Sequence, residues 1–499
     1  MSTAYTLLPL WILLTPLLTA IVIFALGERR QRARIIVNIS AALLKLVLVV
    51  AMLWGVQGGY YFGFTLQILP GTSLDLFADA FTMLFLVLSA MLWLITTIYA
   101  IAYLEHAPNR CRFFGFFSLC MAATMGIATA ANLFTFFVFY ELLTLSTYPL
   151  VVHRGTEKAM RGGKIYLAYT LAGGVLLLLG MVWLKSLGGS LYFVEGGTVN
   201  FLVAEYAWQL RFIFLLMIVG VGVKSALVPF HGWLPEAMVA PAPVSALLHA
   251  VAVVKAGAFG VVRIVHDVFG VPTVKALDMA TLLVIFAALT IVYGSVKALT
   301  QTDIKKRLAY STVSQVSYIT LGIAMGSPLA AIGGLVHLMH QGLMKITLFF
   351  CAGNLAETYD ISRVDQIDGI ARRMPWTMGA FTLAALGMIG VPPVAGFISK
   401  WYLGMGSLES GYGWVIGVLI ASTLLNAAYF LPVIYRAWFL PPSWDWPKST
   451  ELGFRHETHL GLLIPTVFTA LLALAAGMFA GLAYSPKGWV EFIVARLVM

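Results

Sequence analysis

The chain has 499 residues, of which 61% are hydrophobic and only 10% are charged, and its formal net charge is +10. Soluble domains carry roughly 25% charged residues, so the composition excludes an ordinary soluble protein and predicts an all-α polytopic membrane protein. Runs that alternate at period 2 are absent, which argues against an outer-membrane barrel. We interpret the basic excess as loop bias and not as a nucleic-acid surface.

The first apolar run, residues 5–26, is too long for a signal-peptide core and has no basic segment before it, so we predict that it is the first span. About fourteen runs approach the roughly 20 residues that a helical span needs. The splits near Ala131 and Ser327 are the weakest. The predicted spans lie near residues 4–26, 35–56, 79–103, 113–130, 132–152, 164–186, 209–238, 241–266, 275–299, 307–326, 328–355, 376–407, 413–436 and 460–483.

Basic residues alternate between the predicted loops, as the positive-inside rule requires. With both termini on the non-cytoplasmic side, most of them fall in cytoplasmic loops. A missed span would invert every later loop, so this agreement supports the count. The cytoplasmic set is Arg29, Arg30, Arg32, Arg34, Arg110, Arg112, Arg154, Lys158, Arg161, Lys164, Lys305, Lys306, Arg307, Arg363, Arg372, Arg373, Arg436, Lys448 and Arg455.

Two predicted spans are too long and too interrupted to be plain helices. Span 7 (209–238) contains Pro229 and Pro235, and span 12 (376–407) contains Pro392 and Pro393. Broken backbone in a membrane is tolerated only inside protein or beside water. The two spans lie five apart, which predicts two inverted five-helix repeats with a transport site between them. The expected domains are 1–112 (spans 1–3), 113–266 (spans 4–8), 275–436 (spans 9–13) and 437–499 (C-terminal loop and span 14).

Charged residues inside apolar spans mark the candidate transport path, because each central charge costs about 2.5–3.5 kcal/mol on insertion scales. His249 lies near Lys255 on the same predicted helix, and His337, Gln341 and Lys345 follow at i, i+4 and i+8, which predicts one polar stripe. Burial and a nearby carboxylate shift the pKa of lysine in opposite directions, so such lysines can load and release protons. The charged residues within spans are Glu141, Lys45, Lys224, Lys255, Lys345 and Lys400.

Some residues carry no such signal. Lys45 is mid-span and fits snorkelling only weakly, so its role stays open. His456 and His459 in the sequence HETH lack the spacing of a helical zinc site, and we expect solvated loop residues. The cysteines Cys111, Cys120 and Cys351 show no metal spacing, and we expect no disulfide, iron–sulfur cluster, metal or cofactor.

Taken together, Glu141 and the segments KSALVPFHGWLPEAMVAPAPVSALLHAVAVVKAG, TDIKKRLAYSTVSQVSY and GVPPVAGFISK resemble the antiporter-like family. That family includes the large proton-pumping subunits of complex I, the A and D subunits of Mrp-type sodium/proton antiporters, and subunits of membrane-bound hydrogenases. The length and the GVPPVAGF segment look closest to the D-type subunit of Mrp antiporters or to hydrogenase-associated relatives. We see no lateral C-terminal helix, which argues against the longest complex I subunit.

The resemblance implies roles for individual residues. Glu141 matches the glutamate that pairs with the span-7 lysine, here Lys224. His249 and Lys255 match the span-8 pair, and His337 and Lys345 the central span-11 pair. Lys400 matches the terminal lysine of span 12. Gln341 stands where some relatives have histidine, and a water would take that place.

The sequence therefore favours a proton-translocating subunit of a larger complex in the cytoplasmic membrane. We expect a multisubunit cation/proton antiporter whose cargo is protons, with sodium as a further candidate ion. The expected order runs from Glu141 and Lys224 past Lys255 and His249 to Lys345 and Lys400, or the reverse. The alternative is a proton-pumping subunit of a complex I-like oxidoreductase, a membrane-bound hydrogenase or another ion-driven complex. The sequence contains no motif of an independent redox enzyme. The presence of all the buried glutamate, lysine and histidine residues argues against a structural subunit that has lost transport. The driving partner and the direction of flow stay open.

Overall fold

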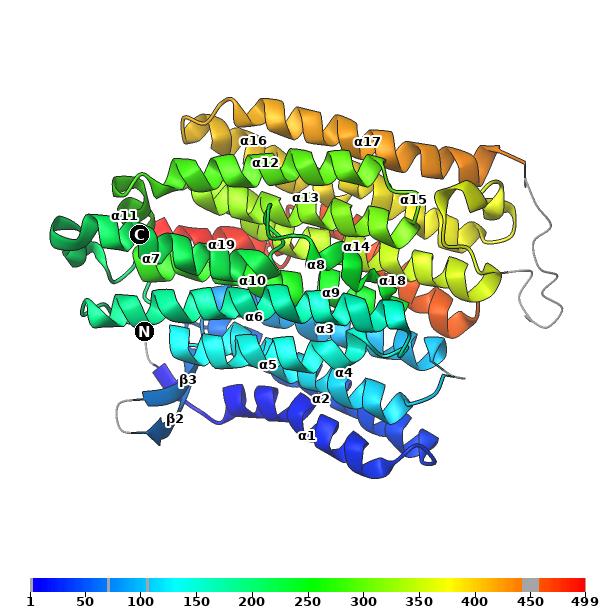
Figure 1. The fold of residues 1–499 in the computed structure, drawn as a ribbon, viewed down its shortest axis with the longest axis horizontal. Helices are drawn as coiled ribbons and strands as arrows, with labels where there is room; N and C mark the ends of the chain where they lie inside the picture. Colours follow the sequence, from blue (N-terminus) through cyan, green and yellow to red (C-terminus); the bar gives the residue numbers. More distant parts are fainter. Residues whose placement is uncertain (1–2, 70–71, 105–106, 442–456, 499) are drawn as a thin grey trace.

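The computed structural model describes residues 3–69, 72–104, 107–441 and 457–498. Its helices run largely side by side along one direction and form a bundle (Figure 1). They are α1 (Leu8–Leu26), α2 (Gln31–Gln57), α3 (Ala80–Tyr103), α4 (Arg110–Thr129), α5 (Leu133–Val151), α6 (Glu157–Ser186), α7 (Val203–Lys224), α8 (Trp233–Glu236), α9 (Ala242–Ala250), α10 (Val253–Arg263), α11 (Val271–Ala276), α12 (Met279–Leu299), α13 (Ile304–Met325), α14 (Pro328–Tyr359), α15 (Pro375–Ile389), α16 (Ala395–Glu409), α17 (Val415–Phe439), α18 (Leu460–Met478) and α19 (Pro486–Val498).

The helices agree with the predicted spans. Within the described ranges, 12 helices are long and apolar enough to cross a membrane. The two remaining predicted crossings correspond to α13, which is rich in serine and threonine, and to the broken pair α15 and α16. The splits near Ala131 and Ser327 are confirmed, because Asn132 and Ser327 cap α5 and α14 through their side chains, as residues of these types do at helix N-termini.

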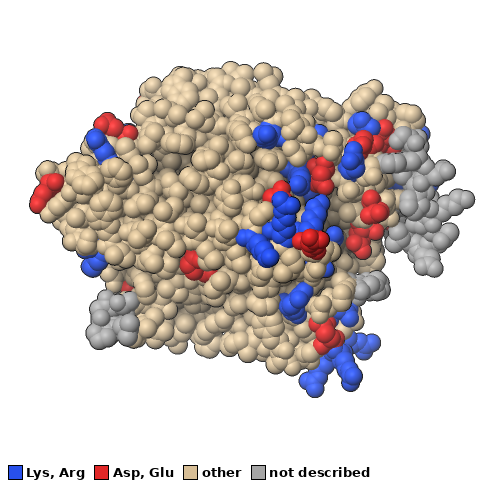
Figure 2. Space-filling view, viewed as in Figure 1, with Lys and Arg blue, Asp and Glu red and all other residues tan. Residues whose placement is uncertain are grey.

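The two ends of the bundle differ in charge. Lysine and arginine side chains gather over the right-hand part of the molecule, where the connections α1–α2, α3–α4 and α5–α6 lie (Figures 1 and 2). We call this the basic end. Strand β1 and helix α19 lie toward the opposite end (Figure 1), so the described chain starts and finishes on one side. Lys448, Arg455 and His456 fall outside the described residues.

A small sheet marks the end opposite the basic end, which we call the sheet end. Strands β1 (Thr3–Tyr5) and β2 (Tyr61–Leu69) are parallel, and β2 pairs antiparallel with β3 (Thr72–Ala78). The absence of strands was therefore a wrong expectation. In the sequence, aromatic and β-branched residues flank a Pro-Gly dipeptide between β2 and β3. This pattern is a turn signal for a single hairpin, and it differs from the many alternating strands that a barrel requires.

Both predicted breaks are confirmed. Helix α7 ends at Lys224 and α8 starts at Trp233, while α15 ends at Ile389 and α16 starts at Ala395. Proline lies in each gap and removes a backbone donor. Span 8 is also broken, between α9 and α10, at Val251 and Ala252. The prediction of one continuous helix through His249 and Lys255 is therefore wrong, and no proline or glycine in the gap reveals it.

The last predicted span, 460–483, is followed by a further helix. Helix α18 ends at Met478 and α19 begins at Pro486, and in Figure 1 α19 lies nearer the sheet end than α18. The indole of Trp489 in α19 donates to the carbonyl of Ala80 at the start of α3, 3.0 Å away. The predicted span 460–483 therefore ends too late as a helix and misses α19, which packs against α3 and α14.

Candidate functional site

Glu141 lies in the middle of α5 and is half-buried. Its carboxylate is directed toward α6 at Gly174, where a Cβ atom would collide with the carboxyl group. The buried Oε1 atom has no hydrogen-bond partner among the described residues. A buried carboxylate oxygen needs such a partner, so this position is suited to a water molecule.

Lys224 is the last residue of α7 and is fully buried. Its ammonium donates to the carbonyl of Tyr140, the residue before Glu141. Lys224 and Glu141 lie within range of electrostatic interaction, but they are not among the ion pairs within 4.0 Å. The structure thus brings the predicted pair together through Tyr140, without a direct ion pair.

Lys255 lies in α10, close to the end of α7. A Cβ atom on Gly257 would lie 2.7 Å from the backbone carbon of Lys224, so only glycine permits this approach of the two helices. The Lys255 ammonium donates to the carbonyl of Leu338 in α14 at 2.7 Å. Lys255 therefore connects the first broken span to the central helix α14.

His337 continues this row from α14. Its Nδ1 atom is 2.8 Å from Oγ of Ser399 in α16, and its ring centroid is 5.1 Å from that of Tyr318. His337 also lies within electrostatic range of both Lys255 and Lys400. The imidazole, which can carry a proton on either nitrogen, is thus positioned between two lysines.

Lys400 closes the row at the second break. Its ammonium donates to the carbonyl of Ile389 at 2.6 Å, to that of Met388 at 3.2 Å and to Oγ1 of Thr423 at 3.1 Å. These carbonyls belong to the last turn of α15, and the C-terminal end of a helix attracts positive charge. The Lys400 ammonium is also 5.8 Å from the centroid of the Tyr318 ring, so Tyr318 contacts both His337 and Lys400.

Lys345 forms no hydrogen bond with Lys255 or Lys400 among the described residues, so its expected place between them stays a prediction. Its ammonium contacts α13, with Oγ of Ser311 at 2.7 Å and the carbonyl of Leu308 at 3.2 Å. Because it is eight residues beyond His337 on α14, it lies about 12 Å further along the helix, toward the basic end. His249 is within electrostatic range of Lys345, and its ring is 4.5 Å from that of Phe349.

Lys45 lies apart from this row, on α2. Its ammonium is 4.6 Å from the Trp93 ring centroid, a cation–π arrangement, and has no hydrogen-bond partner among the described residues. It is fully buried, so it does not snorkel. The exposed His459 caps α18, whereas its neighbour Glu457 is buried and accepts from the backbone nitrogen of Trp376; burial raises the pKa of Glu457.

The interior around these lysines and histidines is rich in buried polar atoms that have no protein partner among the described residues. Such atoms need hydrogen bonds, and water supplies them in buried polar sites. Tyr318 and Ser399 lie beside His337 in the structure but were not singled out from the sequence. Their positions in the quoted segments were the available signal, since Tyr318 is in TVSQVSY and Ser399 directly precedes Lys400. Gln341 has neither amide atom paired. Within the described ranges, the unpaired atoms are found on residues such as His249, Gln315, Tyr318, His337, His340 and Gln341.

Fold and site together define an antiporter-like membrane subunit. A family model described as "NADH:quinone oxidoreductase/Mrp antiporter, TM" matches residues 130–426, which include every residue of the row from Glu141 to Lys400. The chain therefore belongs to this family.

Curated relatives and solved structures agree. The chain is 36% identical to NADH-quinone oxidoreductase subunit N of Desulforudis audaxviator, over 82% of this chain and 83% of the relative. It is 26% identical to the D subunit of the Na(+)/H(+) antiporter of Bacillus subtilis, over 80% and 79% of the two chains. A chain in the Mrp complex of Dietzia sp. DQ12-45-1b has the same fold, with a TM-score of 0.84, 22% identity and 99% coverage of both chains.

Proposed function

We propose that the chain moves protons across the membrane through a row formed by Glu141, Lys224, Lys255, His337 and Lys400, as one subunit of a multisubunit complex. Each lysine of this row is bonded to a backbone carbonyl. None of them belongs to an ion pair within 4.0 Å among the described residues. A buried lysine without a bound carboxylate gives up its proton more readily. The proposal rests on this observation: each buried lysine is hydrogen-bonded to an uncharged carbonyl group and not to a carboxylate.

In this proposal Lys345 and His249 form a branch toward the basic end, and not a link in the row. Support comes from the contact of Lys345 with Ser311, whose hydroxyl is 2.8 Å from that of Tyr429. Water bridges the remaining gaps, because packed helices are about 8–10 Å apart, too far for direct transfer between side chains on adjacent helices.

The basic end faces the cytoplasm in this proposal, and both termini face the other side of the cytoplasmic membrane. The distribution of lysine and arginine in Figure 2 supports this orientation, because cytoplasmic loops carry the basic excess.

Two settings suit such a subunit. A cation/proton antiporter, with sodium as a candidate second ion, is supported by the 26% identity to the D subunit of the Na(+)/H(+) antiporter of Bacillus subtilis. A complex I-like oxidoreductase is favoured by the 36% identity to subunit N. Subunits that co-purify with the chain decide between them: redox partners indicate the second setting, and further antiporter subunits indicate the first.

Proton flux into vesicles that contain the purified complex tests the proposal. Lys400→Ala should abolish flux while the complex still assembles, because the substitution removes a charge and not a packed apolar group. Lys158→Ala, an exposed lysine at the start of α6, should transport like the wild type. Wild-type flux in the assembled Lys400 variant would refute the role of this residue.

A further inference from the structure

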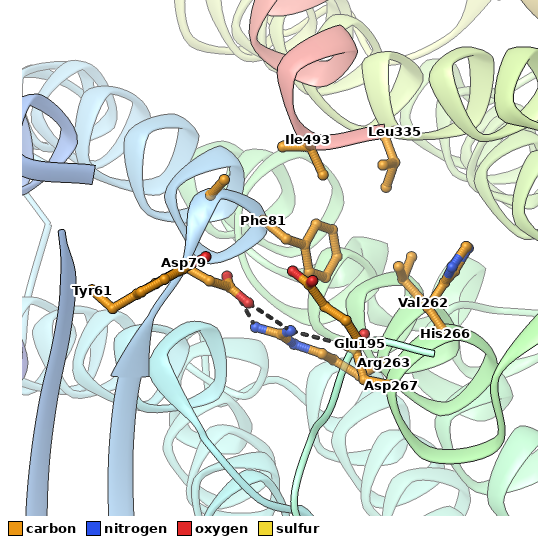
Figure 3. A pocket seen from close by; sticks show the side chains of 11 residues that line it. Tyr61, Asp79, Phe81, Glu195, Val262, Arg263, His266, Asp267, Leu335 and Ile493 are labelled. Carbon is orange, nitrogen blue, oxygen red and sulfur yellow. Dashed lines mark hydrogen bonds and ion pairs between the residues drawn. The ribbon is translucent and has the colours of Figure 1, made fainter. Parts of the chain in front are cut away.

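A second group of charged residues lies at the sheet end, outside the row of lysines. Arg263, in the last turn of α10, forms ion pairs with Asp79 at 3.1 Å and with Asp267 at 2.6 Å. Its side chain is only 5% exposed. Figure 3 shows Arg263 joined to both carboxylates, with Glu195 beside them and His266 farther away, next to Val262. We call Asp79, Glu195, Arg263, His266 and Asp267 the sheet-end cluster.

The cluster surrounds a cavity of about 30 Å³, which is large enough for about two water molecules. Two nitrogen atoms of cavity-lining residues, Nε2 of His266 and Nε of Arg263, are buried and have no partner among the described residues. Buried donors and acceptors require partners, so the cavity is polar enough to hold water.

The cavity leads from the surface into the membrane region. Glu195 at its rim is exposed, the Asp79 side chain is 15% exposed, and that of Asp267 is 6% exposed. Its inner wall includes Val262 of α10 and Leu335 of α14, and Figure 3 shows both on the side away from Tyr61. The charged lining residues thus range from exposed to almost fully buried, and the apolar wall residues Val262 and Leu335 are 3% and 1% exposed.

The floor of the cavity lies close to the proposed row. Leu335 is three residues from Leu338, whose carbonyl binds Lys255, and three residues are about 4.5 Å along a helix. On α10, Val262 is seven residues from Lys255, or about 10 Å. A chain of about three further water molecules, spaced by roughly 2.8 Å, would span this distance to the Lys255 ammonium.

We propose that the sheet-end cluster and its cavity form the port through which protons pass between Lys255 and the water at the sheet end. The inference rests on the proposed function. It adds a separate connection between Lys255, in the middle of the row, and the water at the sheet end. A proton leaving the ammonium passes to cavity water, then to Nε2 of His266, and on to bulk water near Glu195. Each step moves one proton and no electrons, and all steps are reversible.

The charges of the cluster suit this role. Three carboxylates face one guanidinium, so the cluster carries net negative charge when His266 is neutral, and such a site concentrates protons. Arg263 occupies the centre with two carboxylates, which leaves no room there for a metal cation. Tyr61 is the remaining titratable group on the wall.

Accessibility tests whether the cavity admits water-borne reagents. Val262→Cys and Ile264→Cys are matched variants, because both side chains are almost fully buried, at 3% and 1% exposed, but only Val262 lines the cavity. Silver ion, which reacts with thiols and is close in size to a water molecule, is added at the sheet end of the assembled complex, and the thiols that stay free are alkylated and identified by peptide mass. The thiol of the Val262→Cys variant should react about tenfold faster than that of the Ile264→Cys variant, or more. Equal rates, or faster reaction from the basic end, would overturn the port.

Proton flux separates the port from the relay. His266→Gln should lower flux about tenfold or more, as loss of a proton-transferring group does, whereas Asp278→Asn, an exposed sheet-end acid, should leave it unchanged. Wild-type flux in assembled His266→Gln, together with loss of flux in Lys255→Met, would remove the port and keep the relay. Wild-type flux in Lys255→Met would remove the relay itself. If His266→Gln fails to assemble, the thiol rates decide the question.

Discussion

Nδ1 of His337 lies 2.8 Å from Oγ of Ser399, and Ser399 directly precedes Lys400 in α16. This contact links the central helix α14 to the second broken span. Since the Tyr318 ring contacts both His337 and Lys400, the histidine and the terminal lysine share one polar compartment.

Ser399→Ala should lower proton flux, because the hydroxyl orients the imidazole and fixes which nitrogen carries its proton. We expect a loss of about tenfold, measured with a pH-sensitive dye in vesicles. Ser407→Ala is the matched control, since Ser407 is equally buried in the same helix but bonds only to the carbonyl of Gly404. Equal effects of the two substitutions would show that Ser399 is a packing residue.

Glu141→Gln and Lys224→Ala should each stop transport, and the double variant should be little worse than either. The carboxylate and the ammonium lie within electrostatic range across Tyr140, and an opposite charge keeps a buried lysine protonated. Flux in a double-mutant cycle measures the coupling. The exposed pair Arg211 and Asp278 provides a comparison in which little coupling is expected. Strictly additive losses at Glu141 and Lys224 would end the pair mechanism.

Gly174→Ala should impair transport without weakening the fold. A Cβ atom there would strike the Glu141 carboxylate and displace it, whereas alanine in a helix interior is favoured over glycine by about 0.8–1.0 kcal/mol. Gly379→Ala in α15, where a Cβ atom meets open space, should transport normally. Flux per assembled complex is the measurement, and wild-type flux in the Gly174 variant would show that the carboxylate position is not critical.

Both termini should lie on the non-cytoplasmic side of the membrane. The described chain begins and ends on the side opposite the basic end (Figure 1), and basic loops stay in the cytoplasm. Protease-cleavable tags at each terminus of the full chain should be cut when protease is added to the outside of spheroplasts. Tags cut only from the cytoplasmic side would contradict the orientation.

Much of the fold could be predicted from the sequence because membrane insertion imposes strong local rules. Long apolar runs predicted the membrane-spanning helices, and prolines predicted the breaks that follow Lys224 and Ile389. The break at Val251 and Ala252 has no such marker, because it depends on tertiary packing: α9 packs against α14, whereas α10 packs against α7 and α13. The hairpin and α19 are short, so neither produces the long apolar run that marks a membrane-spanning helix.

The candidate site was predicted in part. A charged residue inside an apolar span is conspicuous because its insertion into the membrane costs free energy, so Glu141 and the lysines could be predicted from the sequence. Their order could not, because it depends on which helix each ammonium faces. Lys345 faces α13 while Lys255 faces α14. The sheet-end cluster joins residues of α3 and span 8 that lie 184 positions apart, a contact that single-residue reasoning does not reveal.

Proton flux through the purified complex carrying Lys255→Met tests the central claim most directly. Methionine keeps the length of the side chain but cannot carry a proton, and Lys255 connects the first break to α14 through Leu338. With Lys297→Ala, an exposed lysine of α12, as the control, we predict that the assembled Lys255→Met complex loses about tenfold or more of its flux and the control loses none. Wild-type flux through the assembled Lys255→Met complex would contradict a relay of buried lysines.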